Sequence, residues 1–188
     1  MSNGAGELWQ ITVAVNGAPT TALVETRLTL GDFLRDRRNL KSVHYGCQYG
    51  VCGACTVLVD GESVRSCLMF AVEADGHAVE TVESLSSDPR ELHPIQQAFT
   101  EQFGLQCGFC TPAMVLRTKE ILSGSRALSR EELRNAISGI ACRCTGYQQI
   151  LNAIEAAQEK IGDGLRPSVV PAGPSVAEDQ PVAQGMED

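Results

Sequence analysis

The spacing of hydrophobic residues changes part way along the chain, from a period of two to a period of about 3.6. In residues 11–15, Ile and Val alternate with Thr and Ala, which predicts a strand with one face toward a core. Asn16-Gly17 predicts a tight hairpin turn after that strand. The first part of the chain is therefore predicted to be rich in β-structure, with further strands at residues 20–24, 56–59, 63–64, 68–72 and 78–82.

Helical signals are of two kinds: one short helix among the strands and a run of helices after residue 93. The short helix is expected over residues 29–37, with Thr29 as its N-cap. The later signals are a starting proline, an N-cap followed by proline, a capping box and an apolar stripe. They lie at Pro94, at Thr111-Pro112, at Ser129 with Glu132, and over residues 147–161.

This change of period predicts an α+β chain made of two small domains. The boundary is expected in the polar stretch of residues 83–93. A β-rich domain then covers residues 8–83 and a helical domain residues 84–163. Residues 1–7 are predicted to be flexible. Residues 164–188 contain four of the eight prolines and no aromatic residue, so they are predicted to be disordered.

The charge of the chain argues against a nucleic-acid partner. The formal net charge is −8 and no dense cluster of Lys and Arg occurs, whereas nucleic-acid affinity depends largely on basic side chains. No apolar run approaches the roughly 18–20 residues that span a bilayer. The stretch from Met1 to Glu7 lacks the pattern of a secretory signal, so a cytoplasmic location is expected by default.

Eight cysteines in 188 residues change the picture, because their spacing indicates metal binding. Cys47, Cys52 and Cys55 follow the pattern C-x4-C-x2-C of plant-type [2Fe–2S] ferredoxins, and Cys67 follows after eleven residues. Glycines are interleaved with these thiols, where the backbone must approach a cluster and turn its N–H groups toward the sulfurs. These glycines are Gly46, Gly50 and Gly53. A zinc site and disulfides are the alternatives for this set, although zinc sites more often use paired C-x2-C units.

A second set of four cysteines lies in the helical part. Cys107 and Cys110 precede one predicted helix, and Cys142 and Cys144 precede another. If the two helix N-termini converge, their free N–H groups favour an anionic centre between them. The residues alone leave both an iron–sulfur cluster and a zinc ion open for this set.

Three sequence words together resemble one family closely. They are YGCQYGVCGACTVLVDG at residues 45–61, LQCGFCTPAM at residues 105–114 and CRCTGYQQI at residues 142–150. They resemble the small iron–sulfur subunit, or the corresponding N-terminal region, of the molybdenum hydroxylases, among them xanthine dehydrogenase, aldehyde oxidoreductase and aerobic carbon monoxide dehydrogenase. The resemblance covers about residues 8–162, with all eight cysteines in register.

This resemblance implies a β-grasp, ferredoxin-like domain followed by a four-helix bundle, each with one [2Fe–2S] cluster. It implies that the C-terminal cluster lies next to the molybdopterin cofactor of a large subunit. Gln106 matches a position that contacts the pterin, and Cys144 matches a ligand whose sulfur approaches it. The N-terminal cluster is expected nearer the FAD of a medium subunit, in a dimer of heterotrimers. The chain itself is expected to relay electrons and to have no catalytic residue for substrate.

Two other hypotheses stay open at this stage. A free-standing two-cluster ferredoxin would purify alone, whereas a subunit is expected to purify with flavin- and molybdenum-bearing chains. A zinc-stabilised interaction module would be colourless, whereas a [2Fe–2S] protein is brown. His44, three residues before Cys47, is interpreted as a structural residue, because four cysteines already complete that site.

Overall fold

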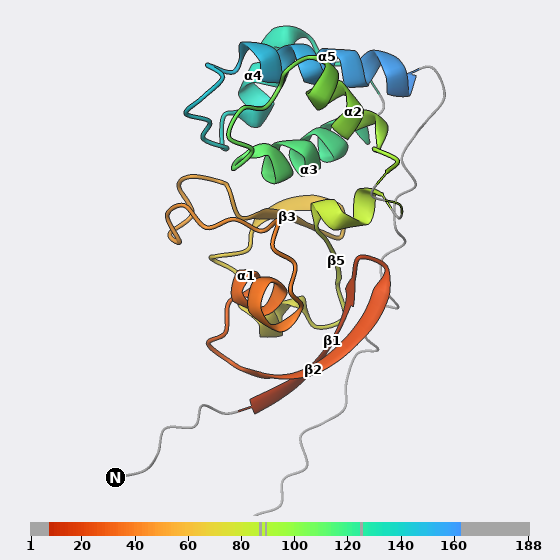
Figure 1. Cartoon of the computed structure of the whole chain (residues 1–188). Helices are drawn as coiled ribbons and strands as arrows, with labels where there is room; N and C mark the ends of the chain where they lie inside the picture. Colours follow the sequence, from red (N-terminus) through yellow and green to blue (C-terminus); the bar gives the residue numbers. More distant parts are fainter. Residues whose placement is uncertain (1–7, 87, 89, 125, 163–188) are drawn as a thin grey trace, which may run out of the picture.

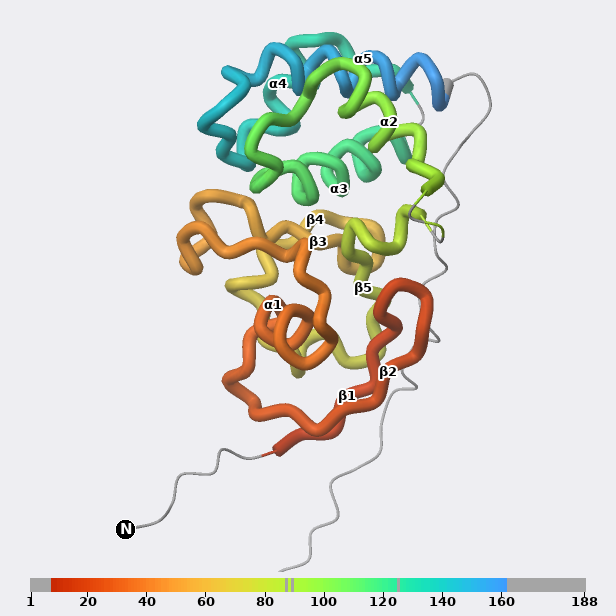
Figure 2. The backbone as a smooth tube through the Cα atoms, viewed as in Figure 1, coloured from red at the N-terminus to blue at the C-terminus, as the bar shows by residue number. Residues whose placement is uncertain are grey.

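The computed structural model describes residues 8–86, 88, 90–124 and 126–162. The predictions for residues 1–7 and for residues 164–188 lie outside this range. Figures 1 and 2 show two regions stacked on each other, one built on a sheet and one built of helices. The expected α+β composition is therefore confirmed.

The first region is a five-stranded mixed sheet with the strand order β2-β1-β5-β3-β4. Strand β1 pairs antiparallel with β2 and parallel with β5, and β3 pairs antiparallel with both β4 and β5. Asn16 and Gly17 have φ of 51° and 79°, which lets the β1–β2 hairpin close in a two-residue turn as predicted. The strands are β1 (Leu8–Val15), β2 (Ala18–Glu25), β3 (Thr56–Val59), β4 (Glu62–Arg65) and β5 (Ala78–Glu80).

A short helical segment packs against this sheet and closes its core. Helix α1 (Leu30–Asp32) continues into a π-helical turn η1 (Phe33–Arg37), and the Thr29 hydroxyl accepts a hydrogen bond from the Asp32 N–H. The predicted N-cap is therefore confirmed. The core between helix and sheet is formed by fully buried side chains, among them Ile11, Val13, Leu30, Phe33, Leu34, Val57 and Val79.

The strand predicted at residues 68–72 is wrong. Phe70 makes only an isolated bridge with Thr29, and a 3-10 helix η2 (Ala71–Ala74) follows at once. The Glu73 carboxylate accepts the Phe70 N–H at 2.6 Å, and this local cap turns the backbone out of the sheet. The strand at residues 78–82 also ends early, because residues Val82–Leu85 form a 3-10 helix η3.

The second region consists of helices α2 (Pro94–Glu101), α3 (Thr111–Leu122), α4 (Arg130–Ile137) and α5 (Gln148–Gly162). Ser129 and Glu132 form the predicted capping box of α4. The predicted N-cap of α3 shifts by one residue, because Cys110 occupies the N-cap and Thr111 the first helical position. The four helices share one core, which includes Ile95, Phe99, Met114, Leu133, Ile137, Leu151 and Ile154. In the part of the chain described, no helix is long and apolar enough to cross a bilayer.

Helix α3 lies across the sheet region and joins the two halves (Figure 1). Lys119 of α3 pairs with Glu80 of β5, and both side chains are about nine-tenths buried, with exposed fractions of 11% and 8%. The Ser63 hydroxyl of β4 hydrogen-bonds to Glu120 of α3. The Arg65 guanidinium donates to the Gly139 carbonyl, 2.7 Å away. These polar contacts join the helical region to β4 and β5.

Candidate iron–sulfur sites

The first four cysteines lie on one irregular loop and on the segment that follows β4. The loop runs over residues 46–55 between η1 and β3, and Gly50 and Gly53 have φ of 84° and 72° within it. The Cys52 N–H donates to the Cys47 sulfur at 3.3 Å. These positive φ values let the backbone turn so that its N–H groups point toward the cysteine sulfurs, which a cluster-binding loop requires.

Hydrogen bonds and burial act differently on the thiols of this first set. The pKa of Cys47 is lowered to about 6, chiefly by the backbone N–H of Cys52. The pKa of Cys67 is raised to about 11, first by burial and then by the neighbouring Cys55 thiol. Deprotonation, which metal binding requires, is therefore easier at Cys47 than at the buried Cys67.

The second four cysteines converge on one cavity of about 260 Å³. Cys107 and Cys110 come from the loop before α3, and Cys142 and Cys144 from the loop before α5, so the starts of these two helices lie at the same cavity. Other residues that line the cavity are Gln106, Phe109, Thr111, Arg143 and Thr145. Gln106, Cys107 and Cys144 are exposed, whereas Cys110 and Cys142 are partly buried.

The thiols of the two loops shift each other's pKa across the cavity. The pKa of Cys107 is lowered by the Phe109 N–H and by the Cys144 thiol, and the pKa of Cys144 is raised chiefly by the same thiol contact. Burial raises the pKa of Cys110 to about 12, with the Cys142 thiol adding to the effect. Burial opposes ionisation of Cys142 as well, but hydrogen bonds led by the Thr145 hydroxyl give it a net lowered pKa.

The donor set of this cavity is four cysteine thiols, and all eight cysteines of the chain are free thiols. Four thiolates can hold one tetrahedral zinc ion or a [2Fe–2S] cluster, in which each iron takes two of them. The residues present therefore match the ligand number and type that a [2Fe–2S] cluster requires.

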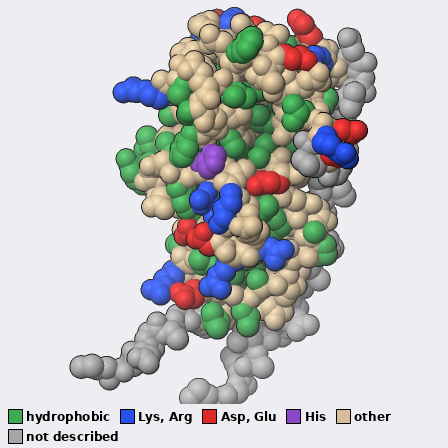
Figure 3. All heavy atoms as spheres, in the orientation of Figure 1, with side chains coloured by type: hydrophobic (Ala, Val, Ile, Leu, Met, Phe, Trp, Pro, Cys, Tyr) green, Lys and Arg blue, Asp and Glu red, His purple; other side chains and the backbone are tan. Residues whose placement is uncertain are grey.

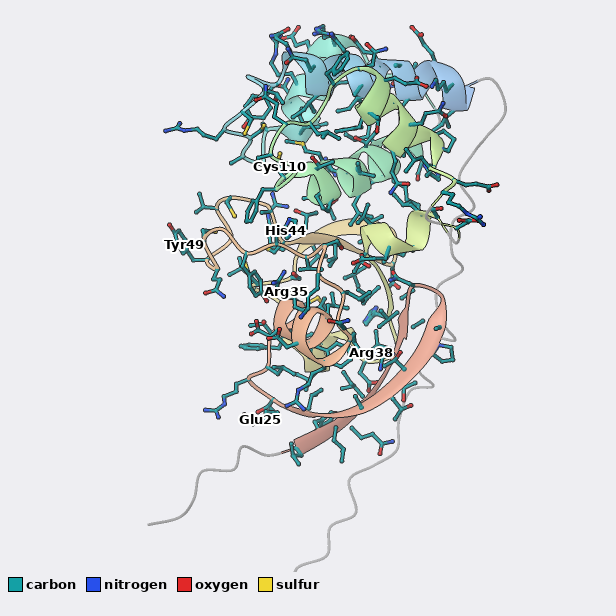
Figure 4. The ribbon with its side chains drawn as sticks, in the orientation of Figure 1. Glu25, Arg35, Arg38, His44, Tyr49 and Cys110 are labelled. Atoms are coloured by element: carbon teal, nitrogen blue, oxygen red, sulfur yellow. The ribbon has the colours of Figure 1, made fainter. Side chains whose placement is uncertain are left out.

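Two contacts join the ligand loops of the two regions. The Ala141 N–H, one residue before Cys142, donates to the Cys52 carbonyl at 2.8 Å. The His44 ring stacks on the Phe109 ring with centroids 4.8 Å apart and an interplanar angle of 14°. Figure 4 shows His44 below Cys110, on the side of the sheet region. The two candidate sites are therefore in direct contact through the backbone and through side chains.

Some supporting residues were not predicted as site residues. The Thr145 hydroxyl lies 3.2 Å from the Cys142 sulfur, and the Tyr147 hydroxyl accepts the Cys142 N–H at 2.9 Å. A threonine directly after C-x-C is a sequence signal for such a local side-chain contact. Tyr147 gave no such signal, because its reach back to the ligand loop depends on the turn before α5. The Arg143 side chain is exposed at the rim of the cavity.

Comparison with known proteins gives two family matches and several close relatives. Residues 13–86 match the family described as a 2Fe-2S iron-sulfur cluster binding domain, and residues 81–155 match the family described as a [2Fe-2S] binding domain. The chain is 50% identical over 149 residues to the caffeine dehydrogenase subunit gamma of Pseudomonas sp. (strain CBB1), covering 78% of this chain and 89% of that protein. It is 46% identical over 154 residues to the nicotine 6-hydroxylase small subunit of Paenarthrobacter nicotinovorans, covering 82% and 92%.

The fold is also similar to that of a solved structure. A chain of quinoline 2-oxidoreductase from Pseudomonas putida 86 superposes with a TM-score of 0.79 at 43% sequence identity. The match covers 85% of this chain and 99% of that chain. Both halves of the fold are therefore similar to a complete chain of an oxidoreductase.

Proposed function

The chain belongs to the family of small iron–sulfur subunits of the molybdenum hydroxylases, and we propose that it relays electrons between two partner subunits. In this proposal electrons enter from the molybdopterin site of a large subunit and leave toward FAD on a medium subunit. The chain supplies the path between them and has no substrate site of its own.

One observation supports this proposal: the eight cysteines are free thiols in two sets of four, and a backbone hydrogen bond from Ala141 to Cys52 joins the loops that carry the two sets. We assign Cys47, Cys52, Cys55 and Cys67 to an N-terminal cluster and Cys107, Cys110, Cys142 and Cys144 to a C-terminal cluster. Each [2Fe–2S] cluster, when bound, accepts and passes on a single electron. The protein's part is to hold the thiolates, to direct N–H groups at their sulfurs and to keep the two sites in contact.

The two sites correspond to two domains in this proposal. We place the boundary at residues 83–84, with a β-grasp domain before it and a four-helix bundle after it. The separation of hydrophobic cores supports this boundary, because Val79 packs in the sheet core whereas Val82 and Leu85 pack against the helical core. The family matches also meet in this region.

The exposed side of the helical region is proposed to face the large, molybdopterin-binding subunit. Gln106, Cys107 and Cys144 are exposed at the cavity of the second cysteine set. Phe103 and Leu105 lie just before them in the chain and expose 76% and 38% of their surface. Gln106 at the rim of this cavity is suited to donate or accept hydrogen bonds with a pterin held by the partner.

An apolar surface around the first cysteine loop is proposed to face the FAD-binding subunit. Tyr49, Val51, Leu68 and Phe70 expose 69%, 72%, 61% and 45% of their surface, and all four lie within three residues of a ligand cysteine. Figure 3 shows hydrophobic side chains beside the histidine that Figure 4 labels as His44. Grouped exposed apolar side chains are typical of a contact surface, and such a surface excludes water where electrons leave.

The composition of the purified protein tests this function. We expect about four irons and four acid-labile sulfides per chain, two distinguishable [2Fe–2S] signals in electron paramagnetic resonance (EPR), and co-purification with flavin- and molybdenum-bearing chains. A colourless protein with two zinc ions would overturn the cluster assignment. A brown protein that purifies alone as a monomer would favour a free-standing ferredoxin instead.

A further inference from the structure

His44 is not a proposed cluster ligand, yet it makes a hydrogen bond to the loop of the second cysteine set as well as the ring contact described above. Its Nδ1 lies 2.8 Å from the Phe109 carbonyl oxygen, in addition to the stacking of the two rings. A carbonyl oxygen can only accept a hydrogen bond, so Nδ1 carries the proton and donates it. Phe109 stands between Cys107 and Cys110, so His44 holds the ligand loop of the other region by its backbone and its side chain together.

The residues on either side of His44 are held in place by contacts within the sheet region. Val43, directly before it, is 2% exposed, and its carbonyl accepts a hydrogen bond from the Arg35 guanidinium. Tyr45, directly after it, is held by the Thr29 hydroxyl at 3.2 Å, and the Arg35 guanidinium lies over its ring at 5.7 Å. Figure 4 shows Arg35 and His44 in sequence below Cys110. The imidazole is therefore presented from a fixed segment.

The carbonyl that His44 holds belongs to the peptide whose N–H is that of Cys110. The nitrogen of this N–H is three covalent bonds from the Cys110 sulfur, so it lies beside a proposed cluster ligand. A hydrogen bond to a peptide carbonyl polarises the peptide and makes its N–H a stronger donor. N–H groups that donate to cluster sulfurs stabilise the reduced, more negative cluster.

We propose that His44 is a positioning residue of the C-terminal cluster: from the N-terminal region, it seats the Cys107–Cys110 loop and raises the reduction potential of the cluster on that loop. The inference rests on the proposed function, since it assumes that these cysteines hold a [2Fe–2S] cluster. It gives the N-terminal region control over an electron carrier to which it contributes no ligand. It also makes electron transfer sensitive to the contact between the two regions.

Two substitutions of His44 distinguish the effect of its N–H donor from the effect of its aromatic ring. His44→Phe keeps an aromatic ring that can stack on Phe109 but removes the N–H donor, and His44→Asn keeps a side-chain N–H donor but removes the ring. His77→Phe is the matched control, because His77 Nδ1 pairs with Asp60 at 2.6 Å within the sheet region. Each variant is prepared in the full complex, and its iron content is measured first. The signal of the C-terminal cluster is identified as the one that Cys110→Ser removes.

An EPR-monitored redox titration then tests the proposal. We expect His44→Phe to shift the midpoint potential of the C-terminal cluster to more negative values and to slow the reduction of flavin by substrate several-fold. We expect His44→Asn to remain near the wild type, and the N-terminal cluster to keep its potential in both. Equal C-terminal potentials in the wild type and His44→Phe would overturn the proposal, as would equal shifts in His44→Phe and His44→Asn.

The two proposals fail in different ways. Absence of both cluster signals from the wild-type protein contradicts the proposed function, before any variant is compared. Two normal signals in the wild type with no response to His44→Phe contradict only the role of His44. If His44→Phe loses iron, the potential of the C-terminal cluster in His44→Asn is compared with the wild type instead. Phe109→Leu is the reference, because it removes the ring contact and keeps the carbonyl. A fall in potential in His44→Asn as large as that in Phe109→Leu shows that stacking, and not hydrogen-bond donation, acts on the cluster.

Discussion

At the scale of single residues, the cysteines supply the thiolate ligands, and the glycines let the backbone of the ligand loop turn and approach its neighbours. The cysteine spacing was readable from the sequence because the C-x4-C-x2-C pattern depends on local chain geometry. The convergence of the Cys107–Cys110 loop and the Cys142–Cys144 loop on one cavity depends on how α3 and α5 pack, which spacing alone does not give. Gly53 was predicted as part of the cluster loop, but its contact with the helical region was not predicted.

The two cluster assignments can be separated by a single thiol. We expect Cys110→Ser to remove the C-terminal cluster signal and to block the reduction of flavin by substrate, because serine oxygen is a poor replacement for thiolate at iron. The N-terminal cluster signal should remain, since none of its four proposed ligands is changed. EPR spectra of the reduced complex and stopped-flow measurement of flavin reduction check both points. Loss of both signals together would contradict two separate sites.

Gly53 is expected to be intolerant of a side chain for two reasons. Its φ is +72°, and a Cβ there would lie 2.4 Å from the Gly139 carbonyl oxygen and 2.9 Å from the Ile140 Cα. Gly61 has a similar φ of +86° but no atom within 4 Å of such a Cβ. Gly61→Ala should therefore cost only the left-handed backbone strain of about 1–2 kcal/mol. Gly53→Ala should cost clearly more, as measured by denaturant unfolding. Equal losses would show that the two regions do not press together at Gly53.

At the scale of elements, the sequence predicted the helices and most strands, and it failed where a local cap competes with the sheet. The capping box at Ser129 and Glu132 is a local signal, so it was predicted and confirmed. The segment at residues 68–72 has strand-like composition, yet Glu73 caps the Phe70 N–H and a 3-10 helix forms. The pairing of α3 with the sheet was not predicted, because the contact between Lys119 and Glu80 joins residues far apart in the sequence.

The buried ion pair between α3 and β5 is expected to matter for stability mainly when it is broken on one side. Lys119→Met leaves the Glu80 carboxylate buried without its partner, and Glu80→Leu leaves the Lys119 ammonium in the same position. Each single change should cost about 3–5 kcal/mol of unfolding free energy. The double variant should cost much less than the sum, because no unpaired charge remains. Additive losses in a double-mutant cycle would show that the two groups do not interact.

At the scale of the whole molecule, the fold joins the loops of the two cysteine sets and leaves apolar side chains exposed around the first set. The order of the two domains followed from the family resemblance and from the change of hydrophobic period. The direct contact between the sites could not be read from the sequence, because the Ala141–Cys52 hydrogen bond uses backbone atoms that any residue supplies. The same is true of the Phe109 carbonyl that His44 holds.

The apolar surface near the first cysteine loop should bind the flavin-bearing subunit. Val51 is 72% exposed, so Val51→Asp should leave the fold and the iron content unchanged. The buried carboxylate at the interface should weaken association with the flavin subunit at least about tenfold. Leu23→Asp is the matched control, since Leu23 is 61% exposed on β2, which β1 and β5 separate in the sheet order from β3, the strand that follows the loop. Association is measured by analytical size-exclusion chromatography and by titration of the separated subunits. Equal effects of the two substitutions would contradict a specific docking surface at Val51.

The hydrogen bond from Ala141 to Cys52 also limits how far the two halves are interchangeable modules. A ferredoxin transplanted in place of the first half would bring its own cluster, but it would need a carbonyl at the position of Cys52 and room for the Gly139–Ile140 backbone beside its loop. Chimaeras made at the proposed boundary of residues 83–84 that lack these contacts are therefore expected to transfer electrons between the two clusters poorly. Grafts are expected to succeed when they keep both contacts between the halves, the Ala141–Cys52 hydrogen bond and the close approach of Gly53 to Gly139 and Ile140.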